Sequence, residues 1–412
     1  MGNLSIVQEE FLKILETFMH DKTYQFPEGF TSVKELHQMA AVHKMTAAVY
    51  EQVREHSIFG QDEYREIAMR FKGETIRDVM LQAQREAGFV SIYKRLCEQG
   101  LRPLVVKGAI CRNLYTKPDY RVSGDEDMLL RKEEFELCDK LLLEEGMQRE
   151  ELDMENLPYE IPYRNPHNGV YIELHFSLFP QESGAYGHLN NEFAEAFDKC
   201  ICEKVQNVDI WTLDPTLHLF YLICHAFKHF LHGGVGIRQV CDMIKMAEYY
   251  GEKIDWRYIE SRLRELRMWD FWKGLVEIGR EHLGFIPENV SYPKQMLTEQ
   301  IDPSHLLLDL LDSGVFGDST MERKHSANVT LAAAESGKKD MTASLRASLF
   351  PKMSYMKNGY PWLEKYPIIL PVAWMMRIAS YLRYSNRKSD ESSSIEIGMD
   401  RVELLREYHI ID

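Results

Sequence analysis

Three acidic residues, Asp125, Glu126 and Asp127, stand immediately before the apolar run 128–130. Charged groups seldom open a core-forming segment unless another group balances them. If this segment is a β-strand, its side chains alternate between two faces, so Asp125 and Asp127 point one way and Glu126 points the other way. The two aspartates therefore need a partner on their own face.

A second stretch, "GVYIELHFSLF", offers that partner, because as a strand it places Glu173 and His175 on one face. If the two strands are neighbours, the carboxylates of Asp125, Asp127 and Glu173 converge at one end of the sheet. Converging carboxylates repel one another, and bound divalent cations relieve the repulsion; Mg²⁺ is the expected ion, with Mn²⁺ as the alternative. This set is typical of two-metal phosphoryl or nucleotidyl transfer, in which one ion activates the attacking hydroxyl and the other carries the triphosphate.

The spacing of apolar residues predicts the elements that carry these acids. "RPLVVKG", which ends at Gly108, and "DEDMLLR" are strand candidates, and "EEFELCDKLLLEEG" is an amphipathic helix closed by Gly146. Residues before 99 show helical spacing, and the chain is helical again from Asp214, where Asp-Pro begins a helix. We therefore predict an α+β fold with a small mixed sheet, flanked by helical regions on both sides.

Four parts of the chain follow from this order. They are an N-terminal helical region (1–99), an α+β core (100–208), a helical domain that closes the cleft (209–345), and a basic amphipathic segment with a flexible tail (346–412). A chain of 412 residues exceeds what one hydrophobic core usually supports, so more than one domain is expected.

Composition narrows the setting. The 45% hydrophobic content excludes disorder over most of the chain, and the net charge of −15 argues against broad nucleic-acid binding without a local basic patch. The seven cysteines lack zinc-type spacing and indicate reduced thiols. The first residues lack the basic and apolar regions of a signal peptide. We therefore expect a cytoplasmic protein without a transmembrane segment.

At this point the sequence resembles a family. A strand that ends in "KG", an "R-x-x-G-D-x-D" strand and an "E-L-H" strand, separated by helices, are similar to the uncharacterised bacterial nucleotidyltransferases of the DNA polymerase beta-like superfamily, and the layout is also similar to nucleotidyltransferase-type toxins of abortive-infection systems. The resemblance is best over 100–180 and extends less specifically to 225–243. It implies that Asp125 and Asp127 bind metal with Glu173 as the third acid. It also implies that Lys107 and Gly108 line a phosphate-binding turn.

Two residues depart from the pattern of that superfamily. Ala109 follows Gly108 where Gly or Ser is usual, so a serine hydroxyl is missing, and Lys107 or Arg121 is expected to compensate. Glu126 separates the two aspartates where an apolar residue is usual. It would face the helices behind the sheet and would need a cationic partner there, or an exposed strand end.

Histidines at helical spacing suggest an alternative chemistry. His225, His229 and His232 lie on one helical face and could hold zinc, as in a metal-dependent hydrolase. Ala226 stands where a zinc-protease helix carries its glutamate, which favours a helix packed against the cleft, with Lys228 or His229 near the triphosphate. The glycines in "HGGVGIRQV" are expected to end this helix, and Arg238 is a candidate anion contact.

The C-terminal stretch from 346 to 388 carries eight Lys or Arg and one acid, Glu364. Its apolar centre is interrupted by Pro367, Pro371 and Arg377, so it does not fit a membrane span. We expect an amphipathic helix docked on the protein. Weak contact with an anionic membrane surface, or recruitment of a polyanionic acceptor such as RNA, remains open.

Taken together, these patterns favour a metal-dependent nucleotidyltransferase that moves a nucleoside monophosphate from an NTP to an unidentified acceptor and releases pyrophosphate. The acceptor could be RNA, a sugar phosphate, a small molecule or a protein. Lys107 and Arg121 are expected to neutralise the triphosphate, with Gly108 and Lys228 also in the nucleotide site and His175 near the acceptor. The alternative is a catalytically inactive nucleotide- or partner-binding protein on the same fold, which would not release pyrophosphate.

Overall fold

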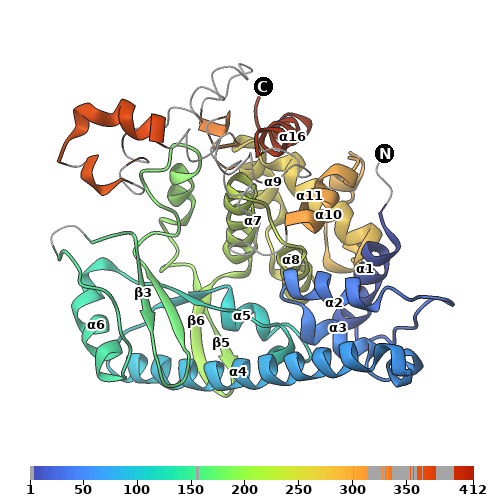
Figure 1. The fold of residues 1–412 in the computed structure, drawn as a ribbon. Coiled ribbons are helices and arrows are strands. Elements are labelled where there is room, and N and C mark those ends of the chain that lie inside the picture. The colour runs from blue at the N-terminus through green and yellow to red at the C-terminus, as the bar shows by residue number, and fades with distance from the viewer. Residues whose placement is uncertain are drawn as a thin grey trace.

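The computed structural model describes residues 4–154, 157–299, 301–313 and 394–412 continuously, together with short stretches between 327 and 376. Its centre is a four-stranded mixed sheet in the order β1-β2-β4-β3. The strands are β1 (Leu104–Val106), β2 (Glu126–Leu129), β3 (Glu160–Arg164) and β4 (Tyr171–His175). β2 and β4 are parallel, whereas β1 and β3 run antiparallel to their neighbours. This sheet and the surrounding helices (Figure 1) confirm the α+β prediction.

The register of β2 and β4 is the feature that matters for function. Asp127 lies opposite Glu173, and Leu129 lies opposite His175. The strands predicted around "VVKG", "DEDML" and "YIELH" are all present. β3 was not predicted, because Pro162 interrupts its pattern; the proline is tolerated since β3 lies at the edge of the sheet.

A separate hairpin joins the sheet region to the later helices. β5 (Cys200–Val205) and β6 (Val208–Leu213) pair antiparallel, and β6 packs beside β1. Position 208, where the predicted core ends, is the first residue of β6, so the hairpin crosses that division. The division into four parts otherwise stays a prediction.

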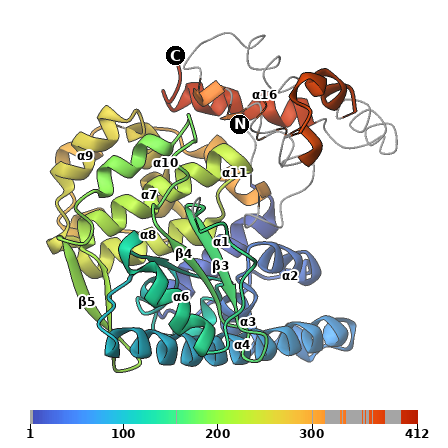
Figure 2. The ribbon, with the colours of Figure 1, turned by 90° about the vertical axis from the view of Figure 1, so that its left-hand side faces the viewer.

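The N-terminal helices rest on one long helix. α1 (Ile6–Met19), α2 (Val33–Val42) and α3 (Thr46–Val53) pack together, and α4 (Arg65–Glu98) runs along the base of the molecule beneath them and the sheet (Figures 1 and 2). Two short helices belong to the core, α5 (Gly108–Arg112) and α6 (Phe135–Glu144), and Gly146 ends the second with φ +79°.

The later helices begin where the sequence predicts. α7 (Pro215–His232) is capped by Asp214, whose carboxylate accepts the N–H groups of Thr216 and Leu217, and it ends at Gly233. The next α-helices along the chain pack with α7 or with one another. They are α8 (Ile237–Tyr250), α9 (Trp256–Glu265), α10 (Trp269–His282) and α11 (Ser304–Ser313). One continuous apolar core runs through the helices and the sheet, from Phe11 to Ile411.

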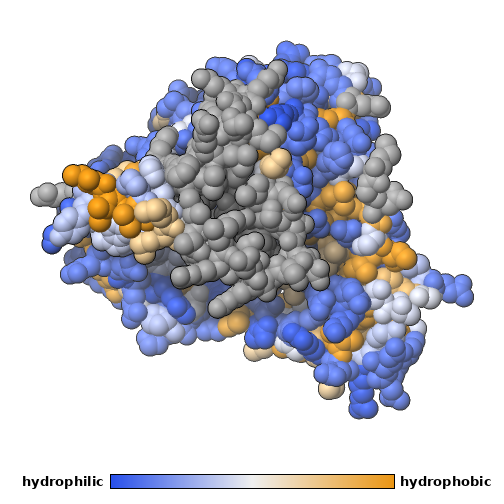
Figure 3. Space-filling view, turned by 45° about the horizontal axis from the view of Figure 1, so that its top comes forward, coloured by the Kyte–Doolittle hydropathy of each residue, from blue (hydrophilic) through white to orange (hydrophobic). Residues whose placement is uncertain are grey.

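The C-terminal segment is described in part. Leu363, Ala373 and Met356 form a small apolar cluster of their own, whereas Ile368 is 92% exposed. Figure 3 shows hydrophobic side chains gathered at the left of the molecule, where this segment lies in Figure 1. The rest of the predicted basic helix, 377–388, lies outside the described residues. The last helix is α16 (Ser394–Glu407). Among the described helices, none has the length and apolar character needed to cross a membrane.

Candidate active site

The turn after β1 is strained and firmly held. Lys107, between β1 and α5, has φ +61° and ψ −132°, a conformation that a non-glycine residue keeps only when its surroundings enforce it. Its backbone N–H donates to Nε2 of the buried His218 on α7, at 3.2 Å. Burial lowers the pKa of His218 to about 3, so the ring is neutral and can accept this bond. The direction of the Lys107 side chain is therefore set by the turn.

Glu126 fixes the same turn from behind. Its Oε2 accepts the backbone N–H of Ala109 at 2.7 Å, and its Oε1 accepts from Nη2 of Arg112 at 2.5 Å. Arg112 has no exposed surface, and it also donates to Glu86 on α4, at 3.2 Å, and to Ser123. Glu126 thus faces the helices behind the sheet, as predicted, and Arg112 is the cationic partner that it required.

Gly108 is the residue that allows this approach. Its φ is +36°, and a Cβ atom at this position would lie 2.1 Å from Oε2 of Glu126. No side chain fits without displacing the carboxylate. Glu126 therefore links the turn of Lys107 and Gly108 directly to the strand of the aspartates.

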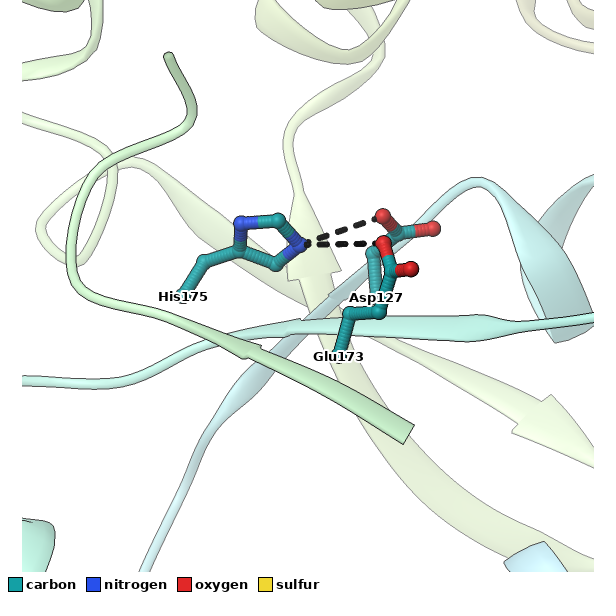
Figure 4. A group of neighbouring side chains, drawn as sticks. All are labelled: Asp127, Glu173 and His175. Carbon is teal, nitrogen blue, oxygen red and sulfur yellow. Dashed lines mark hydrogen bonds and ion pairs between the residues drawn. The ribbon is translucent and has the colours of Figure 1, made fainter. Parts of the chain in front are cut away.

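On the other face of β2, Asp127, Glu173 and His175 come together (Figure 4). Each offers a ligand atom within 4.8 Å of the others. His175 Nε2 lies 3.2 Å from Oδ1 of Asp127 and 3.8 Å from Oε2 of Glu173. The parallel pairing of β2 with β4 produces this group, and Asp127 and Glu173 converge as the sequence predicts.

Asp125 stands just before β2 and belongs to the same cavity, but not to this tight group of three. The cavity has a volume of about 770 Å³, within the range of small-molecule sites. Its wall is formed by the turn after β1, by β2 and β4, and by residues of α2, α4, α7 and α8. The predicted packing of α7 against the cleft is confirmed.

Lys107 supplies the cation closest to the carboxylates. Its Nζ lies 3.0 Å from Oδ2 of Asp127 and 3.1 Å from Nε2 of His225. Burial alone would lower the pKa of Lys107, but the surrounding acidic groups, with Asp127 first among them, together outweigh burial and raise it well above its usual value. In Asp127, burial is likewise outweighed, and Lys107 with His175 brings the pKa below its usual range. In Glu173, burial and the charge of Asp127 raise the pKa to about 8.

Arg121, predicted to contact the triphosphate, is buried in an ion pair. Its Nε donates to Oδ1 of Asp242 on α8 at 3.0 Å, and its Nη2 donates to the other carboxylate oxygen. The hydroxyl of Tyr115 donates to the same Oδ1 at 3.0 Å. Arg121 lines the cavity, but Asp242 balances its charge, as Asp127 balances that of Lys107.

The histidines of α7 take different partners. His225 and His229 line the cavity with their Nε2 atoms 3.0 Å apart, and burial lowers the pKa of both. His232 instead lies 2.6 Å from the hydroxyl of Tyr186. Among the described residues, the side chains close enough together to hold a metal ion are those on β2 and β4, and they do not include the histidines of α7. The geometry therefore does not support a zinc site on α7. Lys228 is half-buried on the same helix, and burial together with Lys107 lowers its pKa.

The group on β2 and β4 fits a divalent cation. Two carboxylates face each other with more negative charge than Lys107 balances once Glu173 ionises. Carboxylate oxygens suit Mg²⁺ and Mn²⁺, and the imidazole of His175 favours Mn²⁺ of the two.

Several residues that shape the site were not predicted. Arg112 could have been noticed as a lone cation in the short helix after "KG", but its partner Glu86 lies 26 positions away, on α4. His218 gave no signal, since it is one of four histidines on α7.

The comparisons with known proteins agree with this geometry. A model of the uncharacterised nucleotidyltransferase family matches residues 31–282, which include α2 to α10 and every site residue described above. No curated protein and no solved structure matches the chain significantly. The family match covers well over half of the chain, which therefore belongs to the uncharacterised nucleotidyltransferase family.

Proposed function

We propose that this protein transfers a nucleoside monophosphate from an NTP to an acceptor and releases pyrophosphate, with divalent cations held by Asp127, Glu173 and Asp125. The observation that carries the proposal is the pairing of Asp127 with Glu173 across β2 and β4, opposite the Lys107–Gly108 turn. Bound cations would polarise the phosphate and lower the pKa of the acceptor hydroxyl. We also propose that the family belongs to the DNA polymerase beta-like superfamily; a bacterial origin of this protein stays a prediction.

The protein groups have separate tasks in this proposal. His175 donates to Asp127 and holds that carboxylate in position. Lys107, fixed by its strained turn, stabilises Asp127 as an anion and lies where it can also reach a nucleotide phosphate. Glu173 holds a proton up to about pH 8 in the protein alone and must lose it to bind a cation. Lys228 on α7 does not line the cavity, but its charge interacts with Asp127 and Glu173.

The size of the cavity bears on the acceptor. About 770 Å³ accommodates a nucleotide together with a small acceptor or with the reactive end of a larger one.

The test follows label from an α-³²P-labelled NTP, with Mg²⁺ or Mn²⁺, into separate panels of RNA, sugar phosphates, small alcohols and proteins. We expect the label to enter one acceptor class, with an equal release of unlabelled pyrophosphate; both should depend on the cation and be lost in Asp127→Asn. Release at the same rate in Asp127→Asn would refute the assignment.

A second candidate, nucleotide binding without transfer, is favoured by one observation: the Lys107 ammonium lies against Asp127, the position that the cation would need. In that case the NTP binds, but no acceptor class becomes labelled and no pyrophosphate appears.

A further inference from the structure

The cations in the cavity divide into those whose charge a carboxylate balances and those without such a partner. Lys107 is paired with Asp127, Arg121 with Asp242, and Arg77 with Asp78. A triphosphate or a phosphorylated acceptor needs positive charge that no carboxylate of the protein already balances. Two arginines in the wall meet this condition.

Arg238 is the first. It lies in the first turn of α8, and its Nη1 donates to the backbone carbonyl of Val122, while its Nε is buried without a partner. No carboxylate of the described residues lies within ion-pair distance of its guanidinium. Burial and the neighbouring Arg121 lower the pKa of Arg238 to about 10, so the cation is poorly compensated. A buried charge of this kind in a cavity wall lowers the stability of the protein unless a bound anion balances it.

Arg85 on α4 is the second. Its Nε is also buried without a partner, and no ion pair involves it within the described residues. Gly169, at the turn between β3 and β4, passes close to it, since a Cβ there would lie 3.4 Å from that Nε. One turn earlier on α4, Gln82 accepts the backbone N–H of Ser123 at 2.9 Å.

The two arginines therefore flank one loop. Arg238 contacts Val122 from the α8 side, and the helical face that carries Gln82 and Arg85 contacts Ser123 from the α4 side. The loop leads directly into Asp125, at the edge of the carboxylate group. Both guanidinium groups and the carboxylates line one cavity.

We infer that Arg85 and Arg238 form an anion-binding subsite beside Asp125, which takes a phosphate group of the nucleotide or of the acceptor. Guanidinium groups suit this ligand because their planar donors match phosphate oxygens in pairs. The beginning of α8 adds the positive end of a helix dipole to the same place. Which molecule carries the phosphate rests on the proposed function; the binding of the anion does not.

The test is calorimetric titration of the full-length protein with inorganic tripolyphosphate and with inorganic phosphate, without metal. Arg85→Gln and Arg238→Gln should each weaken tripolyphosphate binding by about tenfold or more, the loss expected for one charged hydrogen bond. Arg95→Gln is the matched control, because Arg95 is an exposed arginine on α4 outside the cavity. Arg238→Lys keeps the positive charge and should retain part of the affinity. A partial loss in this variant and a full loss in Arg238→Gln would show that the charge, and not only the contact with Val122, binds the anion.

Two further titrations identify the source of the phosphate. If a saturating non-hydrolysable NTP displaces tripolyphosphate, the subsite holds the triphosphate; if inorganic phosphate still binds beside that NTP, the subsite belongs to the acceptor. Equal affinity of wild type and both glutamine variants for both probes would overturn the inference. If anion binding depends on the two arginines but the protein never releases pyrophosphate, the subsite is supported and the proposed function is refuted.

Discussion

Glu126 and Asp127 are neighbours on one strand, both buried, and they differ in what surrounds them. Glu126 meets a backbone N–H and the guanidinium of Arg112, neither of which reaches the cavity wall. Asp127 meets an ammonium and an imidazole, and it lines the cavity together with Glu173. Burial and charge alone therefore do not identify a carboxylate that binds a ligand or takes part in catalysis. The distinction lies in whether its partners are fixed and complete, or displaceable and open to a ligand.

The largest effect should come from the cavity side. Asp127→Asn should lower transfer activity on the order of a thousandfold, about 4 kcal/mol of transition-state stabilisation, because the shared cation ligand is lost. Steady-state pyrophosphate release measures this, with the exposed Glu136→Gln on α6 as the control that should keep wild-type rates. A comparable loss of transfer activity in Glu136→Gln would show that the effect is not specific to the cavity carboxylate.

The rear carboxylate should matter for stability instead. Glu126→Ala should lower the free energy of unfolding by about 3 kcal/mol, because it leaves the buried guanidinium of Arg112 and the N–H of Ala109 without their acceptor. Urea denaturation gives this value. A stability loss as large as this in Asp127→Asn, with none in Glu126→Ala, would invert the comparison.

Gly108 couples the two faces and should show a smaller effect. Gly108→Ala places a methyl group against Glu126 and should cost about 1–3 kcal/mol, from the contact and from positive φ. In the Glu126→Ala background the contact vanishes, so the cost should shrink to the backbone contribution alone. A double-mutant cycle by urea denaturation measures the coupling, and strictly additive losses would show that the carboxylate does not hold the turn.

The smallest effect is a dependence on pH. Glu173 has a folded pKa of about 8, above its usual 4.5, so between these values the folded state keeps a proton that the unfolded state has lost. Stability should therefore fall as the pH rises through this window without metal. Asp127, with a lowered pKa, acts only at more acidic pH, where its contribution is lost as the pH falls. Thermal unfolding of Glu173→Gln should lack the decline between pH 4.5 and 8; the same slope as wild type would assign it to other groups.

The sequence was informative where local pattern decides the structure. The alternation in "DEDML" and "YIELH" located β2 and β4, and Asp-Pro located the start of α7. β3 was missed because Pro162 breaks its pattern, and β5 and β6 carry charged residues that conceal their alternation.

In the candidate site too, the sequence predicted the contacts that follow from strand alternation and missed those that arise from the packing of distant segments. Asp127 and Glu173 could be paired from strand alternation, and Glu126 could be assigned to the rear. The pairing of Arg121 with Asp242 could not, because the two residues lie 121 positions apart and meet only through packing of α8. Arg85 and Arg238 stand out only once the partners of the other cations are known.

The most direct test of the central claim, that the cavity face of β2 binds a divalent cation and a nucleotide, is calorimetric titration with a non-hydrolysable NTP, with and without Mg²⁺. We expect binding that strengthens with Mg²⁺ in wild type and in Glu136→Gln, and no strengthening in Asp127→Asn. Equal affinity with and without Mg²⁺ in wild type, unchanged by Asp127→Asn, would contradict it.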